Sequence, residues 1–153
     1  MKKIGEYSCI GQATSGIVER ITLFDGRFDT AYVLKSIKVA NQDAAAADAD
    51  VWLKVITDKG ANNTADSWNW DDNREIGWAS TNHRGDTSVW ETFTFVNPDN
   101  LIVEDAWICV KALSGSYPSV NYSLEFEKVE LKSDWVGALA MVRNSGQGAP
   151  TDS

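Results

Sequence analysis

The chain has 153 residues, of which 43% are hydrophobic and 24% are charged. This composition is near the globular average and argues against global disorder, and the length suits one domain with an ordinary core. The formal net charge is −8, and residues 39–105 hold thirteen acidic side chains against four basic ones. Because such a surface repels phosphate and no Lys/Arg cluster is interleaved with aromatic residues, we expect no direct contact with nucleic acid.

The N-terminal residues have a basic start but lack the apolar stretch of a signal peptide. No segment reaches the length of a membrane span, so we expect no membrane contact and folding in the cytoplasm. Residues 1–15 are polar and contain Gly11 and a Gln-Ala-Thr-Ser run. We expect them to form an N-terminal arm outside the core, because such termini are loose unless a partner ties them down.

Segments rich in β-branched residues predict the first two strands. The first covers residues 16–24, a turn follows at Asp25-Gly26, and residues 30–40 return as the second strand. Lys35 interrupts the apolar face of this second strand. We therefore place it near the end or the edge of a sheet.

Residues 41–50 fit either a single helical turn or a loop, since four alanines favour helix in a segment too short to stand alone. Residues 51–57 are apolar on both faces except for Lys54, which predicts a strand buried from two sides. Residues 58–74 form the longest turn-rich insertion. A short strand is predicted after it, at residues 75–80.

Another turn is predicted at residues 83–86, followed by a strand over residues 88–96. In that strand Phe93 and Phe95 share one face. Turn residues at 97–100 close it. Further strand is predicted at residues 101–103 and 106–113, with a turn at residues 115–119.

Apolar and polar side chains alternate along residues 120–131. This period-2 pattern is typical of a strand with one solvent-exposed face. The phase changes at Glu127, after which Val129 and Leu131 are apolar in the formerly polar register. A β-bulge or a crossing between sheets would account for this change. Seven or eight such strands predict an all-β fold, a single antiparallel two-sheet β-sandwich over residues 16–145.

A short C-terminal helix is predicted over residues 134–143, because the preceding serine is a good N-cap. Trp135, Leu139 and Val142 fall at i, i+4 and i+7 on one face of this helix. That apolar stripe should pack on the sandwich or on a neighbouring chain, which makes the three side chains interface candidates. Residues 146–153 are expected to form a flexible tail.

The sequence offers no clear catalytic or metal-binding set. His83 is the sole histidine, and no carboxylate pair stands in an apolar setting, so we expect neither an enzyme nor a cofactor. The acidic runs around Asp48 and Asp71 lack the spacing of a calcium loop and are expected to be solvated, without metal. Cys9 and Cys109 are expected to be free thiols rather than a disulfide.

Three of the seven tryptophans flank an acidic turn. Trp68 and Trp70 would share one face of an extended segment, a platform on which a sugar ring could stack while the turn binds its hydroxyls. Tryptophan is also a usual core residue and interface anchor, and we favour core or intersubunit contact. The residues of the alternative glycan site are Trp68, Trp70, Trp78, Asp71, Asp72 and Asn73.

The predicted strands, short turns and one long insertion resemble a jelly-roll sandwich. Three short sequence segments resemble parts of small structural proteins of viruses and phages. They are LFDGRFD at residues 23–29, PDNLIV at residues 98–103 and VNY at residues 120–122.

The resemblance covers residues 16–145 and implies a self-assembling capsid, spike or decoration subunit of a virion. Its partners would be copies of itself and other virion proteins, and it would assemble in the host cytoplasm. Capsid proteins that line a genome often carry a basic arm, whereas here only Lys2 and Lys3 remain, which favours a surface-facing role. The alternative is a carbohydrate-binding module that uses the tryptophan platform.

Overall fold

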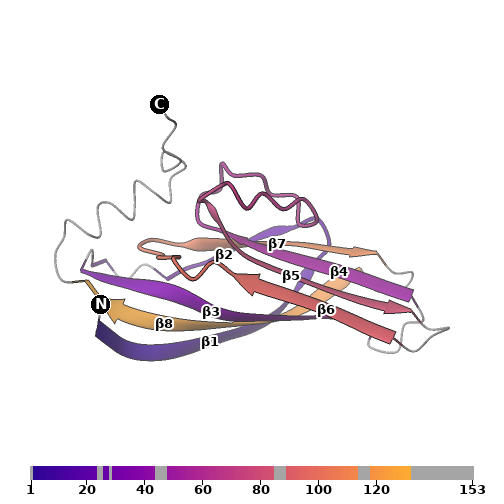
Figure 1. Cartoon of the computed structure of the whole chain (residues 1–153), viewed down its shortest axis with the longest axis horizontal. Coiled ribbons are helices and arrows are strands. Elements are labelled where there is room, and N and C mark those ends of the chain that lie inside the picture. The colour runs from indigo at the N-terminus through magenta and orange to yellow at the C-terminus, as the bar shows by residue number, and fades with distance from the viewer. Residues whose placement is uncertain are drawn as a thin grey trace.

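The computed structural model describes residues 2–23, 26–27, 29–43, 48–84, 89–113 and 118–131. These residues form eight strands and no helix. The strands are β1 (Lys2–Thr14), β2 (Val18–Ile21), β3 (Thr30–Asn41), β4 (Asp48–Ile56), β5 (Glu75–Arg84), β6 (Val89–Val96), β7 (Ala106–Leu113) and β8 (Ser119–Glu130). They form two antiparallel sheets (Figure 1), which confirms the predicted β-sandwich.

The smaller sheet has the strand order β1-β8-β3 and the larger sheet the order β2-β7-β4-β5-β6. The second half of the chain runs back along the first, so that β8 pairs with β1, β7 with β2 and β5 with β4. A long hairpin divided between two sheets in this way is jelly-roll-like. The eight strands are not divided equally between the two sheets, because β6 pairs with β5 in the larger sheet. It contacts β3 without joining the smaller sheet.

The main core lies between the two sheets, and their central strands contribute most of its fully buried side chains. Leu53 and Val55 of β4 and Leu124 of β8 are fully buried in it. Strand β4 is covered on both faces, because Lys54 and Ile56, which point away from this core, are buried as well. The prediction of a strand buried from two sides is therefore confirmed.

The predicted change of phase in β8 is also confirmed. Phe126 faces the main core, whereas Val129 and Leu131 belong to a second, smaller cluster that also contains Ala31 and Val103. Register shifts occur where β1 and β3 pair with β8, between Lys3 and Gly5 and between Leu34 and Ser36. The irregular positions therefore lie in the neighbours of β8 and not in β8 itself.

Lys35 occupies the shifted position in β3. This strand is an edge of the smaller sheet, and the Lys35 side chain is exposed. The expectation that this lysine lies near a sheet edge is confirmed.

The expectation of an N-terminal arm is wrong for Lys2–Thr14. These residues form β1, which pairs with β8 along its whole length. Ala13 is buried and Cys9 packs against the main core. An edge strand needs only one partly covered face, so a polar composition does not exclude it.

Three element boundaries also differ from the prediction, and one of them is the start of β4, at Asp48 instead of residue 51. The first predicted strand shortens to Val18–Ile21, and the strand after the long insertion extends to Arg84. His83 therefore lies in a strand, opposite Trp90 of β6, and not in a turn. The extra length is stabilised by ladders to β4 and β6 on both sides, a long-range contribution.

Other predicted features lie outside the described residues. They are the helix over residues 134–143 with Trp135, Leu139 and Val142, the tail over residues 146–153, the alanine run at residues 44–47, and the turn residues 85–86 and 115–117.

Candidate functional site

The insertion between β4 and β5, residues 57–74, lies over the outer face of the larger sheet (Figure 1). Ala61 and Ala65 of this loop are buried against Ile56 and Cys109 of the sheet. The loop therefore supplies the cover that makes the outward face of β4 and β7 a second apolar layer.

Short polar side chains shape the loop. Asp58 accepts a hydrogen bond from the backbone N–H of Gly60 at 2.8 Å, and Asn62 accepts one from that of Thr64 at 2.9 Å. Such bonds from a side chain to the backbone two residues later stabilise tight turns. The Asp- and Asn-rich composition thus explains why this segment forms successive turns.

A buried ion pair fastens the loop to the sheet. Lys54 Nζ of β4 lies 3.2 Å from Glu75 Oε2 of β5, and both side chains are inaccessible to solvent. Lys54 also donates to the carbonyl of Ser67 at 2.8 Å. Glu75 accepts hydrogen bonds from Asn69 N at 2.8 Å, Asn69 Nδ2 at 2.9 Å and Trp78 Nε1 at 3.1 Å. Because these partners satisfy both charged groups, the pair holds loop residues 67–69 in one position.

The loop places two tryptophans against β6. Together with neighbouring rings of β5 and β6 they form a continuous series of ring contacts, which we call the aromatic strip. It consists of Trp68, Phe93, Trp70, Phe95 and Trp78. Successive ring centroids lie 5.5, 6.3, 5.3 and 5.6 Å apart. These separations are those of attractive aromatic pairs, so the strip also helps to hold the loop on the sheet.

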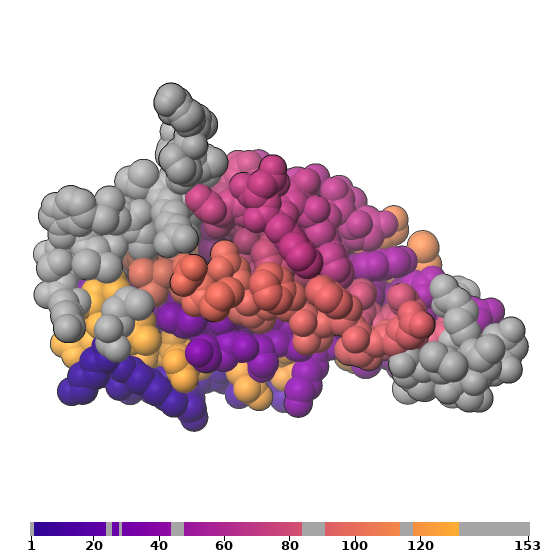
Figure 2. Space-filling model, in the orientation of Figure 1, coloured from indigo at the N-terminus to yellow at the C-terminus, as the bar shows by residue number. Residues whose placement is uncertain are grey.

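The aromatic strip is only partly covered. Trp70 is 59% exposed, Phe93 42% and Phe95 41%, whereas Trp78 beneath them is 2% exposed. In Figure 2 the magenta surface of the loop lies beside the coral surface of β6 and the residues that follow it. Exposed apolar side chains that lie next to one another are a common feature of interaction surfaces.

The residues of the predicted glycan site are divided by the fold. Trp70 is accessible and Asp71 is exposed, but Trp78 is buried and offers no ring face to a ligand. Asp72 forms an ion pair with Arg74, with Oδ2 and Nη2 2.8 Å apart. The hydrogen bond from that guanidinium lowers the pKa of Asp72, so its carboxylate is already engaged.

The other two predicted members are half-buried. Trp68 stacks on Phe93, with an angle of 29° between the ring planes, and Asn73 lies within the turn. The sequence identified Trp68 and Trp70 but did not connect them with Phe93 and Phe95. Their shared face on the strand at residues 88–96 was the available signal.

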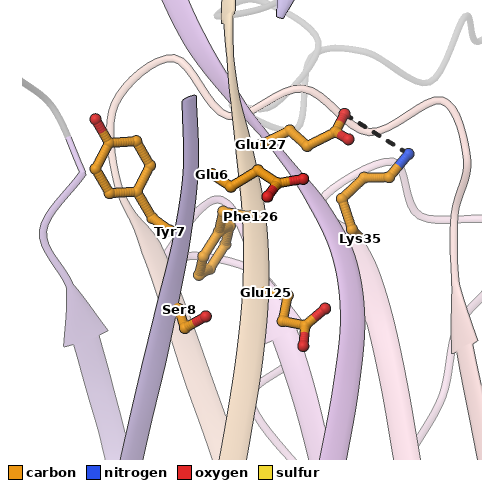
Figure 3. A pocket seen from close by; sticks show the side chains of 7 residues that line it. All are labelled: Glu6, Tyr7, Ser8, Lys35, Glu125, Phe126 and Glu127. Atoms are coloured by element: carbon orange, nitrogen blue, oxygen red, sulfur yellow. Dashed lines mark ion pairs between the residues drawn. The ribbon is translucent and has the colours of Figure 1, made fainter. Parts of the chain in front are cut away.

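The smaller sheet carries a depression of about 330 Å³, lined by residues of all three of its strands (Figure 3). Its lining residues are Glu6, Tyr7, Ser8, Lys35, Glu125, Phe126 and Glu127. Glu6 and Glu127 lie opposite each other in the pairing of β1 with β8, and Lys3 forms ion pairs with both. Lys35 Nζ is 3.9 Å from Glu127 Oε2. Basic side chains thus already pair with the two opposed carboxylates, and such solvent-exposed networks contribute little stability.

Within the described residues, no three His, Cys, Asp or Glu side chains are grouped so as to hold a metal ion. Cys9 and Cys109 are both free thiols, as predicted. Burial raises the pKa of Cys109 to about 11 and also raises that of Cys9. The reactive thiolate is therefore disfavoured at both positions.

No helix in the described part of the chain is long and apolar enough to cross a membrane. Sequence comparison gives no match, either to a protein-family model or among curated proteins. The fold and the site together define a two-sheet β-sandwich with exposed aromatic side chains on its larger sheet.

Proposed function

We propose that the protein is a non-enzymatic structural component of a virus particle, a jelly-roll subunit that contacts copies of itself and other virion proteins. The observation that supports this role is that one jelly-roll body exposes large apolar side chains on both of its sheets. Trp70, Phe93 and Phe95 lie over the larger sheet, and Ile10 lies on the outer face of β1 in the smaller one. Two separate apolar surfaces allow a subunit to contact two different neighbours, as an extended assembly requires.

Repetition would compensate for the modest strength of each contact. In a closed or extended shell every subunit makes the same contacts several times, so weak binding at one surface is multiplied. The net charge of −8 favours a soluble free subunit and opposes binding to nucleic acid. This charge supports a surface-facing shell, spike or decoration subunit over a genome-lining one.

Assembly of the purified chain tests this role. Size-exclusion chromatography with light scattering, combined with electron microscopy, would be run from about 0.05 to 1 M salt, because salt screens repulsion between the acidic subunits. We expect species larger than a monomer to increase with salt. Trp70→Ser with Phe93→Ser should reduce them, whereas Thr94→Ser, on the opposite face of β6, should not. A chain that stays monomeric in all conditions and never enters particles would contradict the proposal.

Carbohydrate binding is a second candidate, favoured by the exposure of Trp70 beside the exposed Asp71. A ring of this kind can stack on a sugar while a carboxylate accepts hydrogen bonds from its hydroxyls. A glycan panel read by tryptophan fluorescence would show a sugar-dependent change that is lost in Trp70→Ala. Absence of any change would exclude this function, and a change that survives Trp70→Ala would exclude Trp70 as its site.

A further inference from the structure

Strand β1 has an open edge. It is the longest described strand, with 13 residues, and it pairs with β8 on one side only. Among the described residues no strand pairs with its other side, and β1 lies at the outer margin of the smaller sheet (Figure 1). An open edge presents unpaired backbone N–H and C=O groups, and proteins usually protect it with charges, prolines or bulges.

Those protective features are confined to the first five residues of β1. Lys2, Lys3 and Glu6 carry charges there, and the register shift lies between Lys3 and Gly5. Residues 7–14 contain no charged residue and no proline. Half of a long edge strand is therefore left open to pairing.

The unprotected half also carries the most exposed large hydrophobic side chain in the described part of the chain. Ile10 is 81% exposed and lies on the outer face of the sheet, opposite Ser123 of β8. Its neighbours on the same face of β1, Ser8 and Gln12, are neutral, and Gln12 donates a hydrogen bond to Asn121 at 2.8 Å. The charged Glu125 lies on β8, opposite Ser8, and not on the open edge. Two chains that each carry a net charge of −8 can approach here without bringing like charges together.

We propose that two copies of this chain join antiparallel along β1, with Ile10 opposite Ile10, so that their three-stranded sheets become one continuous sheet. An antiparallel pair of identical strands has two-fold symmetry, which makes the strand complementary to itself. In this register Ser8 faces Gln12 and Glu6 faces Thr14, so no two like charges are opposed. A register centred on Glu6 would place two carboxylates opposite each other, which is unfavourable.

This inference rests on the proposed assembly role and specifies one contact within it. Ile10→Lys places two ammonium groups opposite each other and removes the apolar contact. We expect it to raise the dissociation constant of the dimer about tenfold or more, measured by sedimentation velocity. Ile17→Lys, at an isoleucine that is 49% exposed but outside any strand, is the matched control and should leave dimerisation unchanged.

A mixing experiment tests the register. Ile10→Lys and Ile10→Glu should each dimerise more weakly than the wild type when alone, and a mixture of the two should dimerise more strongly than either because opposite charges then face each other. Circular dichroism of each variant verifies that it is folded. A mixture that fails to dimerise would overturn the pairing of Ile10 with itself.

Failure of the edge pairing and failure of the virion role give different results. A wild-type chain that stays monomeric, or an Ile10→Lys chain that dimerises like the wild type, overturns the edge pairing, while entry into particles still decides the virion role. A dimer that is lost in Ile10→Lys but never enters particles supports the edge pairing and refutes the virion role.

Discussion

Removal of the Glu75 carboxylate should be among the most damaging single changes in this protein. Glu75→Leu would leave the ammonium of Lys54 buried without its counter-ion and would remove the acceptor for Asn69 and Trp78. Breaking a fully buried pair in this way costs about 3–5 kcal/mol. Since domains of this size are stable by about 5–15 kcal/mol, the loss would be a large fraction of the free energy of unfolding.

The converse change should be milder. In Lys54→Met the Glu75 carboxylate keeps the hydrogen bonds from Asn69 and Trp78, so it remains partly compensated. The double variant, Lys54→Met with Glu75→Leu, buries no unpaired charge and should be more stable than Glu75→Leu alone. The coupling energy expected for such contacting residues is about 0.5–3 kcal/mol.

Urea unfolding followed by tryptophan fluorescence would measure the free energies of unfolding of the wild type, the two single variants and the double variant. Hydrogen exchange at the Asn69 amide would report separately on the loop, and we expect faster exchange in Glu75→Leu. Glu75→Leu within about 1 kcal/mol of the wild type, or a double variant equal to the sum of the single ones, would refute the reasoning.

Gly77→Val should destabilise the sandwich by about 1–3 kcal/mol in urea unfolding, because a Cβ there would lie 2.6 and 2.8 Å from side-chain carbons of β3; unchanged stability would contradict this close approach. A thiol reagent at pH 8 should label the half-buried Cys9 faster than Cys109, whose pKa of about 11 reflects burial, and the difference should vanish in urea; equal rates in the folded protein would refute it. The hydrogen bond from Arg74 lowers the pKa of Asp72 in the folded protein. The ionised carboxylate therefore stabilises the fold at pH values above its unfolded-state pKa of about 3.9. This stabilisation is lost as the pH falls through the lower folded-state pKa. Asp72→Asn should therefore be less stable than the wild type at neutral pH but equal to it at about pH 2, and a difference that persists in acid would contradict this linkage.

The sequence by itself determined the strands whose burial pattern is local. Alternation along residues 120–131 predicted β8 and the change of phase at Glu127, because a strand places successive side chains on opposite faces wherever it lies in a fold. The doubly apolar run around Lys54 predicted a strand covered on both faces, and β4 is such a strand. Together these patterns were enough to specify a two-sheet β body.

The tertiary structure alone decided which distant segments meet. Strand β1 is held in place by its pairing with β8, more than a hundred residues away. The polar N-terminal sequence contains no pattern that indicates this partner. Glu75 became the counter-ion of Lys54, and Phe93 and Phe95 became neighbours of Trp70, only when the loop folded back over the larger sheet. The periodicity of a sequence shows only which face of its own strand a residue occupies. Strand pairing and burial depend instead on which residues lie close together in space, and these residues can be far apart in the sequence.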